Sequence, residues 1–261
     1  MDKSTLHSLL RKMVDTDASD LFLTTGAPPH IKVKGESWPL QMPALASGQA
    51  GAAAYSIMSA QQIADFERQL EANLSYNAPG IGRFRISVYR QRSETAMVAR
   101  LIHSTIPDFE TLGLPPVVRD LALLKRGLLL VVGSAGSGKS TTLASMIDHR
   151  AHHSQGHILT VEDPIEYLFT HDRSTVDQRE IGTDTHSFAD ALRNAMRQAP
   201  DVIMIGEIRD RETMEHAIAY AETGHLCVST LHAANASQAL KRIINFFPEI
   251  LHPQLRLDLS L

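Results

Sequence analysis

Nine consecutive residues in the middle of the chain have the types and the spacing of a phosphate-binding loop. The stretch GSAGSGKST fits the pattern G-x-x-x-x-G-K-[S/T], follows the apolar run LLLVV and precedes a helical pattern. Glycines let backbone N–H groups turn towards phosphate oxygens, and the start of the helix adds the positive end of its dipole. The residues of this loop are Gly133, Ser134, Ala135, Gly136, Ser137, Gly138, Lys139, Ser140 and Thr141. We therefore expect the loop to bind the phosphates of a nucleotide.

Two side chains of the loop have defined chemistry. The ammonium group of Lys139 supplies a point charge for the β- and γ-phosphates. The hydroxyl of Ser140 is a ligand for Mg²⁺ in loops of this kind. The expected cofactors are therefore ATP and Mg²⁺.

Polar side chains follow three further apolar runs, at the point where each predicted strand ends. Glu162 follows HILTV, Glu207 follows VIMIG, and His232 follows LCVSTL. Ligands of parallel α/β sheets sit outside the carboxyl ends of the strands, so all three side chains are expected at the edge that carries the phosphate loop. Any one of them alone could equally be a solvated group, but core packing does not explain the convergence of three.

Roles for these residues follow from the needs of phosphoryl transfer to water. Glu207 can hold a water of the Mg²⁺ shell or orient the attacking water, and Glu162 is the other candidate, as general base. His232 is expected to contact the region of the γ-phosphate. His225 lies seven residues earlier, about 20 Å away along a strand, and is therefore expected at the opposite edge of the sheet. The sequence leaves open which glutamate is the base.

The elements that must position these residues can be predicted from periodicity. After residue 117, strands are expected at 127–132, 156–161, 202–205 and 226–231, and helices at 138–151, 187–198, 211–223 and 236–246. Alternation of this kind is typical of a mostly parallel sheet with helices on both faces. The fold class is therefore α/β.

The first hundred residues have a different pattern. Helices are predicted at 1–14, within 44–58, and from Ser59 to about Leu70, and GRFRISVYRQR and TAMVARLIH alternate as antiparallel strands do. Residues 103–116 contain three prolines and one glycine and show little periodicity. We predict a small α+β domain at 1–102, a linker at 103–116 and the α/β domain at 117–261.

Composition excludes several classes of protein. The 261 residues carry a formal net charge of −4, which gives no global attraction to nucleic acid or anionic lipid. The single cysteine, Cys227, excludes an internal disulfide framework and fits a reducing cytoplasm. The longest apolar run, LLLVV, is far shorter than the roughly 20 residues that cross a bilayer. We expect a cytoplasmic protein with no transmembrane segment and no nucleic-acid partner.

A histidine-rich stretch is the other candidate site in the α/β domain. His149, His152 and His153 have helical spacing that could hold a metal ion, and His157 follows them. No cysteine or carboxylate completes a ligand set nearby. An exposed polar face is therefore the favoured interpretation.

Four motifs together resemble the secretion ATPase superfamily. GSAGSGKST is similar to its Walker A motif, TVEDPIEY to its Asp box, DVIMIGEIRD to its atypical Walker B motif and TGHLCVSTLHAANA to its His box. The stretch SDLFLTTGAPPHIKVKGE resembles the PAS-like N-terminal domain of the type IV pilus retraction ATPases. Gln198-Ala199, with AETGHLC and RIINFFP, resembles the accessory branch of that family. The resemblance implies a P-loop, RecA-like ATPase domain preceded by a small PAS-like domain.

The resemblance also implies function and partners. A homohexamer would hydrolyse ATP to power pilus retraction and twitching motility, peripherally at the inner membrane. The implied partners are a paralogous retraction ATPase and an inner-membrane platform protein. Arg83, Arg85 and Arg100 match arginines of the N-terminal domain that reach the phosphates, although a solvated strand face would also explain them. Family members continue past residue 261 with a helical part, so we expect the chain to be C-terminally truncated.

The same motifs are compatible with other functions. A pilus assembly or type II secretion ATPase shares these motifs, and so does a weakly hydrolysing nucleotide-binding regulator of a paralogous motor. The presence of Lys139, Ser140, Glu162 and Glu207 argues against an inactive site. A small-molecule kinase is disfavoured because the sequence shows no acceptor pocket.

Overall fold

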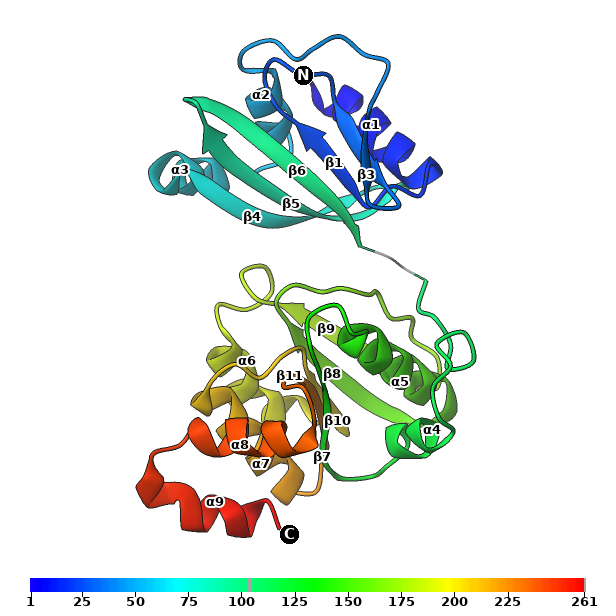
Figure 1. Cartoon of the computed structure of the whole chain (residues 1–261), viewed down its shortest axis with the longest axis vertical. Coiled ribbons are helices and arrows are strands. Elements are labelled where there is room, and N and C mark those ends of the chain that lie inside the picture. The colour runs from blue at the N-terminus through cyan, green and yellow to red at the C-terminus, as the bar shows by residue number, and fades with distance from the viewer. Residues whose placement is uncertain (103–104, 261) are drawn as a thin grey trace. The chain divides into compact units, whose positions relative to one another are not determined.

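The chain forms two compact units, residues 1–103 and 104–261 (Figure 1). The computed structural model describes residues 1–102 and 105–260. Each unit has its own sheet and its own core, and each is described by itself.

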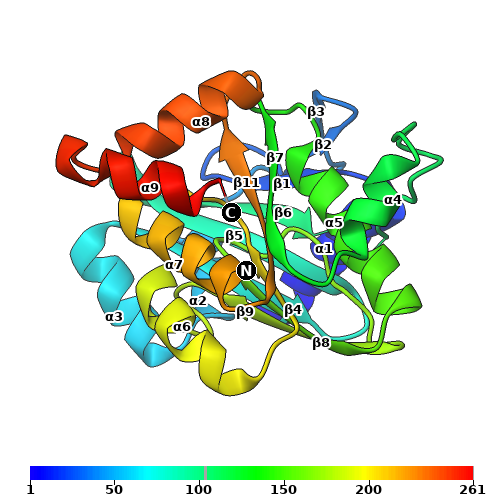
Figure 2. The ribbon, with the colours of Figure 1, turned by 90° about the horizontal axis from the view of Figure 1, so that it is seen from below.

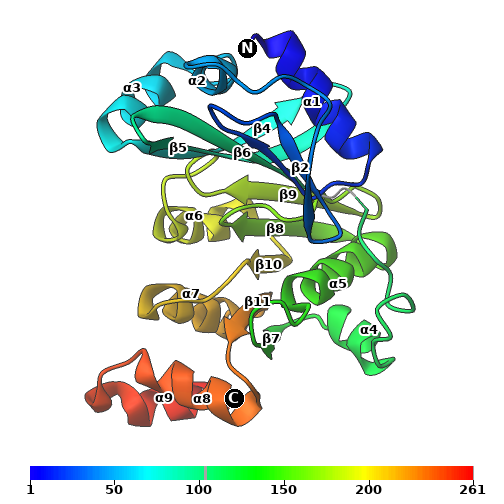
Figure 3. The same cartoon turned by 45° about the horizontal axis from the view of Figure 1, so that its top comes forward.

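The first unit is a six-stranded antiparallel sheet in the order β3-β2-β1-β6-β5-β4. Helices α1, α2 and α3 lie on one face of it (Figure 3). Its elements are α1 (Lys3–Asp15), β1 (Asp20–Leu23), β2 (His30–Val33), β3 (Glu36–Pro39), α2 (Gln49–Tyr55), α3 (Ala60–Gln69), β4 (Glu71–Ala78), β5 (Gly82–Gln91) and β6 (Glu94–Ile102).

Local sequence explains why these elements form. Helix α1 buries Leu6, Leu9, Leu10 and Met13, the residues that share one helical face. Helix α3, predicted to start at Ser59, begins with a reciprocal capping box between Ser59 and Gln62. In β5 the apolar side chains of Phe84, Ile86 and Val88 point into the core, so Arg83 and Arg85, which alternate with them, point to the other face.

The second unit is a five-stranded parallel sheet in the order β7-β11-β10-β8-β9. Its elements are α4 (Val117–Ala122), β7 (Gly127–Gly133), α5 (Lys139–His153), β8 (Gly156–Glu162), β9 (Ser174–Glu180), α6 (Phe188–Ala195), η1 (Met196–Gln198), β10 (Val202–Ile205), α7 (Arg211–Glu222), β11 (Leu226–His232), α8 (Ala236–Asn245), η2 (Glu249–Leu251) and α9 (His252–Asp258).

Helices cover both faces of this parallel sheet (Figure 2). Alternate residues of each strand belong to different cores: Ile203 and Ile205 pack with α6, α7 and α8, whereas Val202 and Met204 pack with α5. Strands buried on both faces explain the nearly continuous apolar runs in the sequence. The predicted fold class is confirmed.

Most predicted elements of the α/β unit lie where the sequence placed them. The helices α6, α7 and α8 begin at side-chain caps, which are Ser187, Asp210 and Asn235. The helix predicted at 187–198 ends earlier, at Ala195, and continues as the 3₁₀ turn η1. The helix predicted within 44–58 is limited to α2.

The segment predicted as a linker begins at residues 103–104, which lie outside the described residues. From residue 105 onwards this segment packs on α5. Phe109 is buried with Met146, and the Ser145 hydroxyl donates a hydrogen bond to the Pro107 carbonyl at 2.6 Å. Across the described residues, no helix combines the length and the apolar character that crossing a membrane requires.

Candidate functional site

The phosphate loop lies between β7 and α5, at the carboxyl edge of the parallel sheet. Gly136 and Gly138 have φ angles of 72° and 86°, a left-handed backbone that favours glycine. A Cβ atom at Gly133 would lie 2.4 Å from the Ser137 hydroxyl oxygen, so a side chain there would displace this hydroxyl. The backbone therefore favours glycine at Gly136 and Gly138, whereas Gly133 leaves room for the Ser137 side chain.

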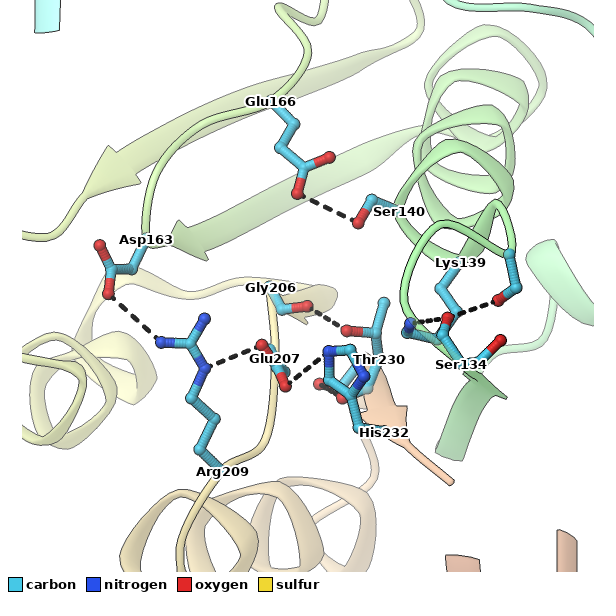
Figure 4. A network of polar contacts seen from close by, with 12 residues as sticks. Ser134, Lys139, Ser140, Asp163, Glu166, Gly206, Glu207, Arg209, Thr230 and His232 are labelled. Atoms are coloured by element: carbon cyan, nitrogen blue, oxygen red, sulfur yellow. Dashed lines mark hydrogen bonds and ion pairs between the residues drawn. The ribbon is translucent and has the colours of Figure 1, made fainter. Parts of the chain in front are cut away.

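The lysine of the loop folds back onto the loop. Lys139 is only 7% exposed, and its Nζ donates a hydrogen bond to the Ser134 carbonyl at 2.7 Å. The Ser137 hydroxyl donates to the same carbonyl at 2.9 Å. Figure 4 shows the contact between Lys139 and Ser134. A phosphate group would have to replace the Ser134 carbonyl as the partner of this ammonium group.

A cavity of about 400 Å³ opens beside the loop at the ends of the neighbouring strands. Glu162 at the end of β8, Glu207 just after β10 and His232 at the end of β11 all line it, together with Lys139 and Ser140. The structure therefore brings together the loop and the three strand-end residues that the sequence singled out.

Glu162 is the most buried of these carboxylates, with 4% exposure. It accepts hydrogen bonds from the Thr160 hydroxyl at 2.7 Å and from the Gln178 amide at 3.1 Å. Burial nevertheless dominates, because it disfavours the charged form, and raises the pKa of Glu162 to about 7. A carboxyl group with such a pKa can gain or lose a proton near neutral pH.

Glu207 is held from two sides (Figure 4). Its Oε2 accepts a hydrogen bond from Arg209 Nε at 2.8 Å, and its Oε1 lies 3.2 Å from His232 Nε2. Gly206 brings the end of β10 close to β8, since its N–H donates to the Val161 carbonyl at 2.8 Å. Glu207 thus has a fixed orientation at the centre of the three strand ends.

Glu166 and Tyr167, in the segment that follows β8, contact the phosphate loop. Neither residue was assigned a role from the sequence. The Ser140 hydroxyl donates to Glu166 Oε1 at 3.1 Å, and the hydroxyls of Thr141 and Tyr167 are 3.1 Å apart. Glu166 stands within the stretch EDPIEY, so a search for every carboxylate near a strand end, and not only the first, would have found it.

Arg209 and Asp163 were also missed. Arg209 Nη1 lies 3.7 Å from Asp163 Oδ2, which joins the segment after β10 to the segment after β8. Both residues line the cavity. The only sequence signal is the position of Arg209 two residues after Glu207, and no spacing rule predicts that contact.

The donor set of the cavity fits a magnesium ion. Mg²⁺ prefers oxygen ligands, above all carboxylates, hydroxyls and phosphates. The Ser140 hydroxyl and the carboxylates of Glu166 and Glu207 all face the cavity. These are the residues that would hold the ion together with the phosphates of a nucleotide.

The arginines predicted to reach the phosphates belong to the first unit. Arg83 and Arg85 lie in β5 and Arg100 lies in β6, where Arg85 and Arg100 are cross-strand neighbours. Arg100 Nε donates to Asp20 Oδ1 at 2.8 Å within that unit. The role of these three residues stays a prediction.

Two further histidine predictions can be placed. His225 precedes β11 at the amino edge of the sheet, and its Nδ1 lies 3.1 Å from the Thr223 hydroxyl. Along α5, the rings of His149 and His153 stack with centroids 4.0 Å apart. Among the described residues no group of three or more histidine, cysteine, aspartate or glutamate side chains could hold a metal ion.

A glycine-rich loop between a parallel strand and a helix, facing carboxylates at the neighbouring strand ends, defines the class of P-loop nucleotide-binding proteins. Residues 3–250 match the model of the family described as type II/IV secretion system protein. The chain therefore belongs to the type II/IV secretion system protein family.

Individual relatives agree with this assignment. The chain is 53% identical over 255 residues to the type IV pilus ATPase PilU of Pseudomonas aeruginosa, covering 98% of this chain and 67% of the relative. It is 43% identical to the retraction ATPase PilT of the same organism, over 93% of this chain and 71% of that protein. A crystal structure of the pilus retraction motor PilT with bound ADP superposes with a TM-score of 0.93 at 45% identity, covering 97% of this chain and 74% of that one. The expected resemblance to the retraction family, and to its accessory branch, is confirmed.

Proposed function

We propose that this protein hydrolyses ATP in the cavity at the carboxyl edge of its parallel sheet, and that the hydrolysis powers retraction of a type IV pilus. One observation carries the proposal. The phosphate loop, with Lys139 and Ser140, shares a single cavity with Glu162, Glu207 and His232 from three different strands. Phosphoryl transfer to water needs these components together: a cradle for phosphate, oxygen ligands for a metal ion and a group that orients water.

The roles of the loop residues follow from their geometry. Backbone N–H groups of the loop and the start of α5 face the phosphates, and Lys139 exchanges its bond to Ser134 for the β- and γ-phosphate oxygens. Ser140, with Glu166 and Glu207, would hold Mg²⁺, which when bound neutralises charge on the β- and γ-phosphate oxygens. Ser140 must first leave its hydrogen bond with Glu166.

Glu162 and Glu207, which both line the cavity, are the two candidates for the general base. Glu162 has a suitable pKa of about 7, because an efficient base titrates near the working pH. Glu166 is more exposed and accepts a hydrogen bond from the Ser140 hydroxyl, so its carboxylate would serve the metal ion rather than act as the base. In this scheme the Glu207 carboxylate, already fixed by Arg209, holds a water of the metal shell, and His232 contacts the γ-phosphate region.

The biological role rests on the similarity to PilU and PilT. We place the protein in an accessory, PilU-like role within a homohexameric motor in the cytoplasm, at the inner membrane. Arg83, Arg85 and Arg100 would supply positive charge to the transferring phosphate, and the motor would act with a paralogous retraction ATPase and a platform protein. The likenesses favour this role over pilus assembly or type II secretion.

A genetic experiment tests the role. We expect deletion of the gene to reduce pilus-dependent twitching motility while surface pili persist, and the wild-type gene to restore motility. The Lys139→Ala gene should not restore it if nucleotide binding is required. Deletion in a strain that also lacks the principal retraction ATPase separates an accessory motor from an independent one. Loss of surface pili in the single deletion would contradict a retraction role.

A further inference from the structure

Arg209 connects two of the three strand ends that line the cavity. It follows Glu207 by two residues, donates to that carboxylate from Nε at 2.8 Å and approaches Asp163 with Nη1 at 3.7 Å. Glu207 stands after β10 and Asp163 after β8, so one guanidinium group spans two neighbouring strands of the sheet. In Figure 4 the side chain of Arg209 points towards both carboxylates.

The two members of the main ion pair differ in their surroundings. The Glu207 side chain is 18% exposed, whereas the Arg209 side chain is 57% exposed. A largely buried carboxylate needs hydrogen-bond donors to offset its lost hydration. Arg209 supplies one donor to Oε2, and His232 faces Oε1, so the two contacts together fix how the carboxylate is turned.

We propose that Arg209 is a positioning residue for Glu207, and that it acts by holding this carboxylate in the orientation that receives the metal-bound water. The inference rests on the proposed function. Partners of this kind, which hold a metal-binding carboxylate from behind, typically change metal affinity or activity by about 10- to 100-fold when removed. The ion pair with Asp163 links the segment after β10 to the segment after β8.

Two other roles for Arg209 lead to different outcomes. An exposed ion pair usually contributes little, in which case removal of Arg209 would change nothing at the site. A guanidinium group that touched the nucleotide directly would stabilise the phosphates with or without a metal ion. The structure favours positioning, because the hydrogen bond and the ion pairs of Arg209 are made with carboxylates of the cavity wall.

The test compares nucleotide binding with and without the metal ion. Fluorescent, non-hydrolysable AMP-PNP is titrated into the full-length protein in Mg²⁺ and in EDTA. We expect Arg209→Ala to reduce the affinity gained from Mg²⁺ by about 10-fold or more, with affinity in EDTA unchanged. Arg209→Lys should recover part of the affinity gained from Mg²⁺, because lysine keeps the positive charge but lacks the rigid, planar set of N–H donors of arginine. In hydrolysis assays kcat should fall, and KM for ATP should rise in step with the loss of affinity in Mg²⁺.

Arg211 provides a matched control two residues further on. It pairs with Glu215 on α7 and lies over the Phe247 ring, outside the lining of the cavity. Arg211→Ala should leave both titrations unchanged. Equal losses for Arg209→Ala in Mg²⁺ and in EDTA, or no loss in either, would overturn the positioning role. A wild-type protein that binds neither ADP nor AMP-PNP would instead overturn the proposed function itself.

Discussion

Both edges of the parallel sheet carry a histidine and a carboxylate close together. At the amino edge these side chains bond to their neighbours, whereas at the carboxyl edge they line a cavity. At the amino edge, the His157 N–H donates to Asp201 Oδ2 at 2.8 Å, its ring Nδ1 lies 3.0 Å from the Gln198 carbonyl, and its Nε2 lies 3.1 Å from Asp177. At the carboxyl edge, His232 and Glu207 also pair, yet they face a cavity of about 400 Å³.

The two edges differ in the free space around their polar side chains rather than in the charge of those side chains. A Cβ atom at Gly156 would lie 2.5 Å from Asp201 Oδ2, so at the amino edge the Asp201 side chain occupies the space beside Gly156. The carboxyl edge keeps its polar groups around an opening whose wall is a phosphate loop. A histidine and a carboxylate at a strand end are therefore a candidate site only where the backbone leaves room for a ligand.

The largest expected effect is the loss of turnover in Glu207→Gln at the carboxyl edge. The substitution keeps the shape of the side chain and removes the charge that orients water or a metal-bound water. We expect kcat for ATP to fall by about 100- to 1,000-fold, as for groups that act directly in proton transfer or water positioning. Steady-state hydrolysis with saturating Mg²⁺ measures it, and nucleotide affinity serves as the control for folding. Equal rates for variant and wild type would remove Glu207 from the mechanism.

A smaller effect is expected on stability in Glu162→Gln. The folded pKa of about 7 lies above the ordinary value of 4.5, so the folded state binds more protons than the unfolded state between these values. Wild-type stability should therefore fall as pH rises from about 4.5 to about 7, by up to about 3 kcal/mol. The glutamine variant should lack this loss and be more stable than wild type at pH 8, with little difference below pH 4.5.

Denaturant unfolding in Mg²⁺-free buffer across this pH range checks the Glu162 prediction. The exposed Glu249 offers a control, since Glu249→Gln should follow the wild-type curve. A Glu162→Gln protein with the wild-type pH dependence would show that the buried carboxyl titrates normally.

The smallest effect is expected at the amino edge. Asp201→Ala removes the acceptor of the His157 N–H and should lower the free energy of unfolding by about 1 kcal/mol. Nucleotide affinity should stay at the wild-type value, because the residue lies at the opposite edge from the cavity. Isothermal titration with ADP measures this, and a clear loss of affinity would break the contrast between the edges.

The residues at the carboxyl edge of the sheet could largely be predicted from the sequence. The apolar runs before Glu162, Glu207 and His232 predict strands, and parallel strands place their ends together. Strand β9 was not predicted because its sequence, STVDQRE, is mostly polar. It lies at the edge of the sheet and pairs with one strand only, β8, so it does not need a continuous apolar run. Helix α4 was missed because it is only six residues long and follows two prolines.

The partners of the site residues could not be predicted in the same way. The contacts of Arg209 with Asp163 and of Ser140 with Glu166 depend on how two loops turn after their strands. No periodic pattern encodes these turns. The pKa of Glu162 likewise depends on contacts between residues that are distant in sequence, because burial in the folded chain raises it and the hydrogen bond from Gln178 on β9 partly offsets that rise.

The central claim is that the open carboxyl edge binds the phosphates of a nucleotide, and the affinity of Lys139→Ala tests it most directly. Removing a charge-assisted contact should weaken binding of fluorescent ADP on the order of 100-fold. His157→Ala, at the closed amino edge, should bind like the wild type. A Lys139→Ala protein that binds ADP as tightly as wild type would contradict the account.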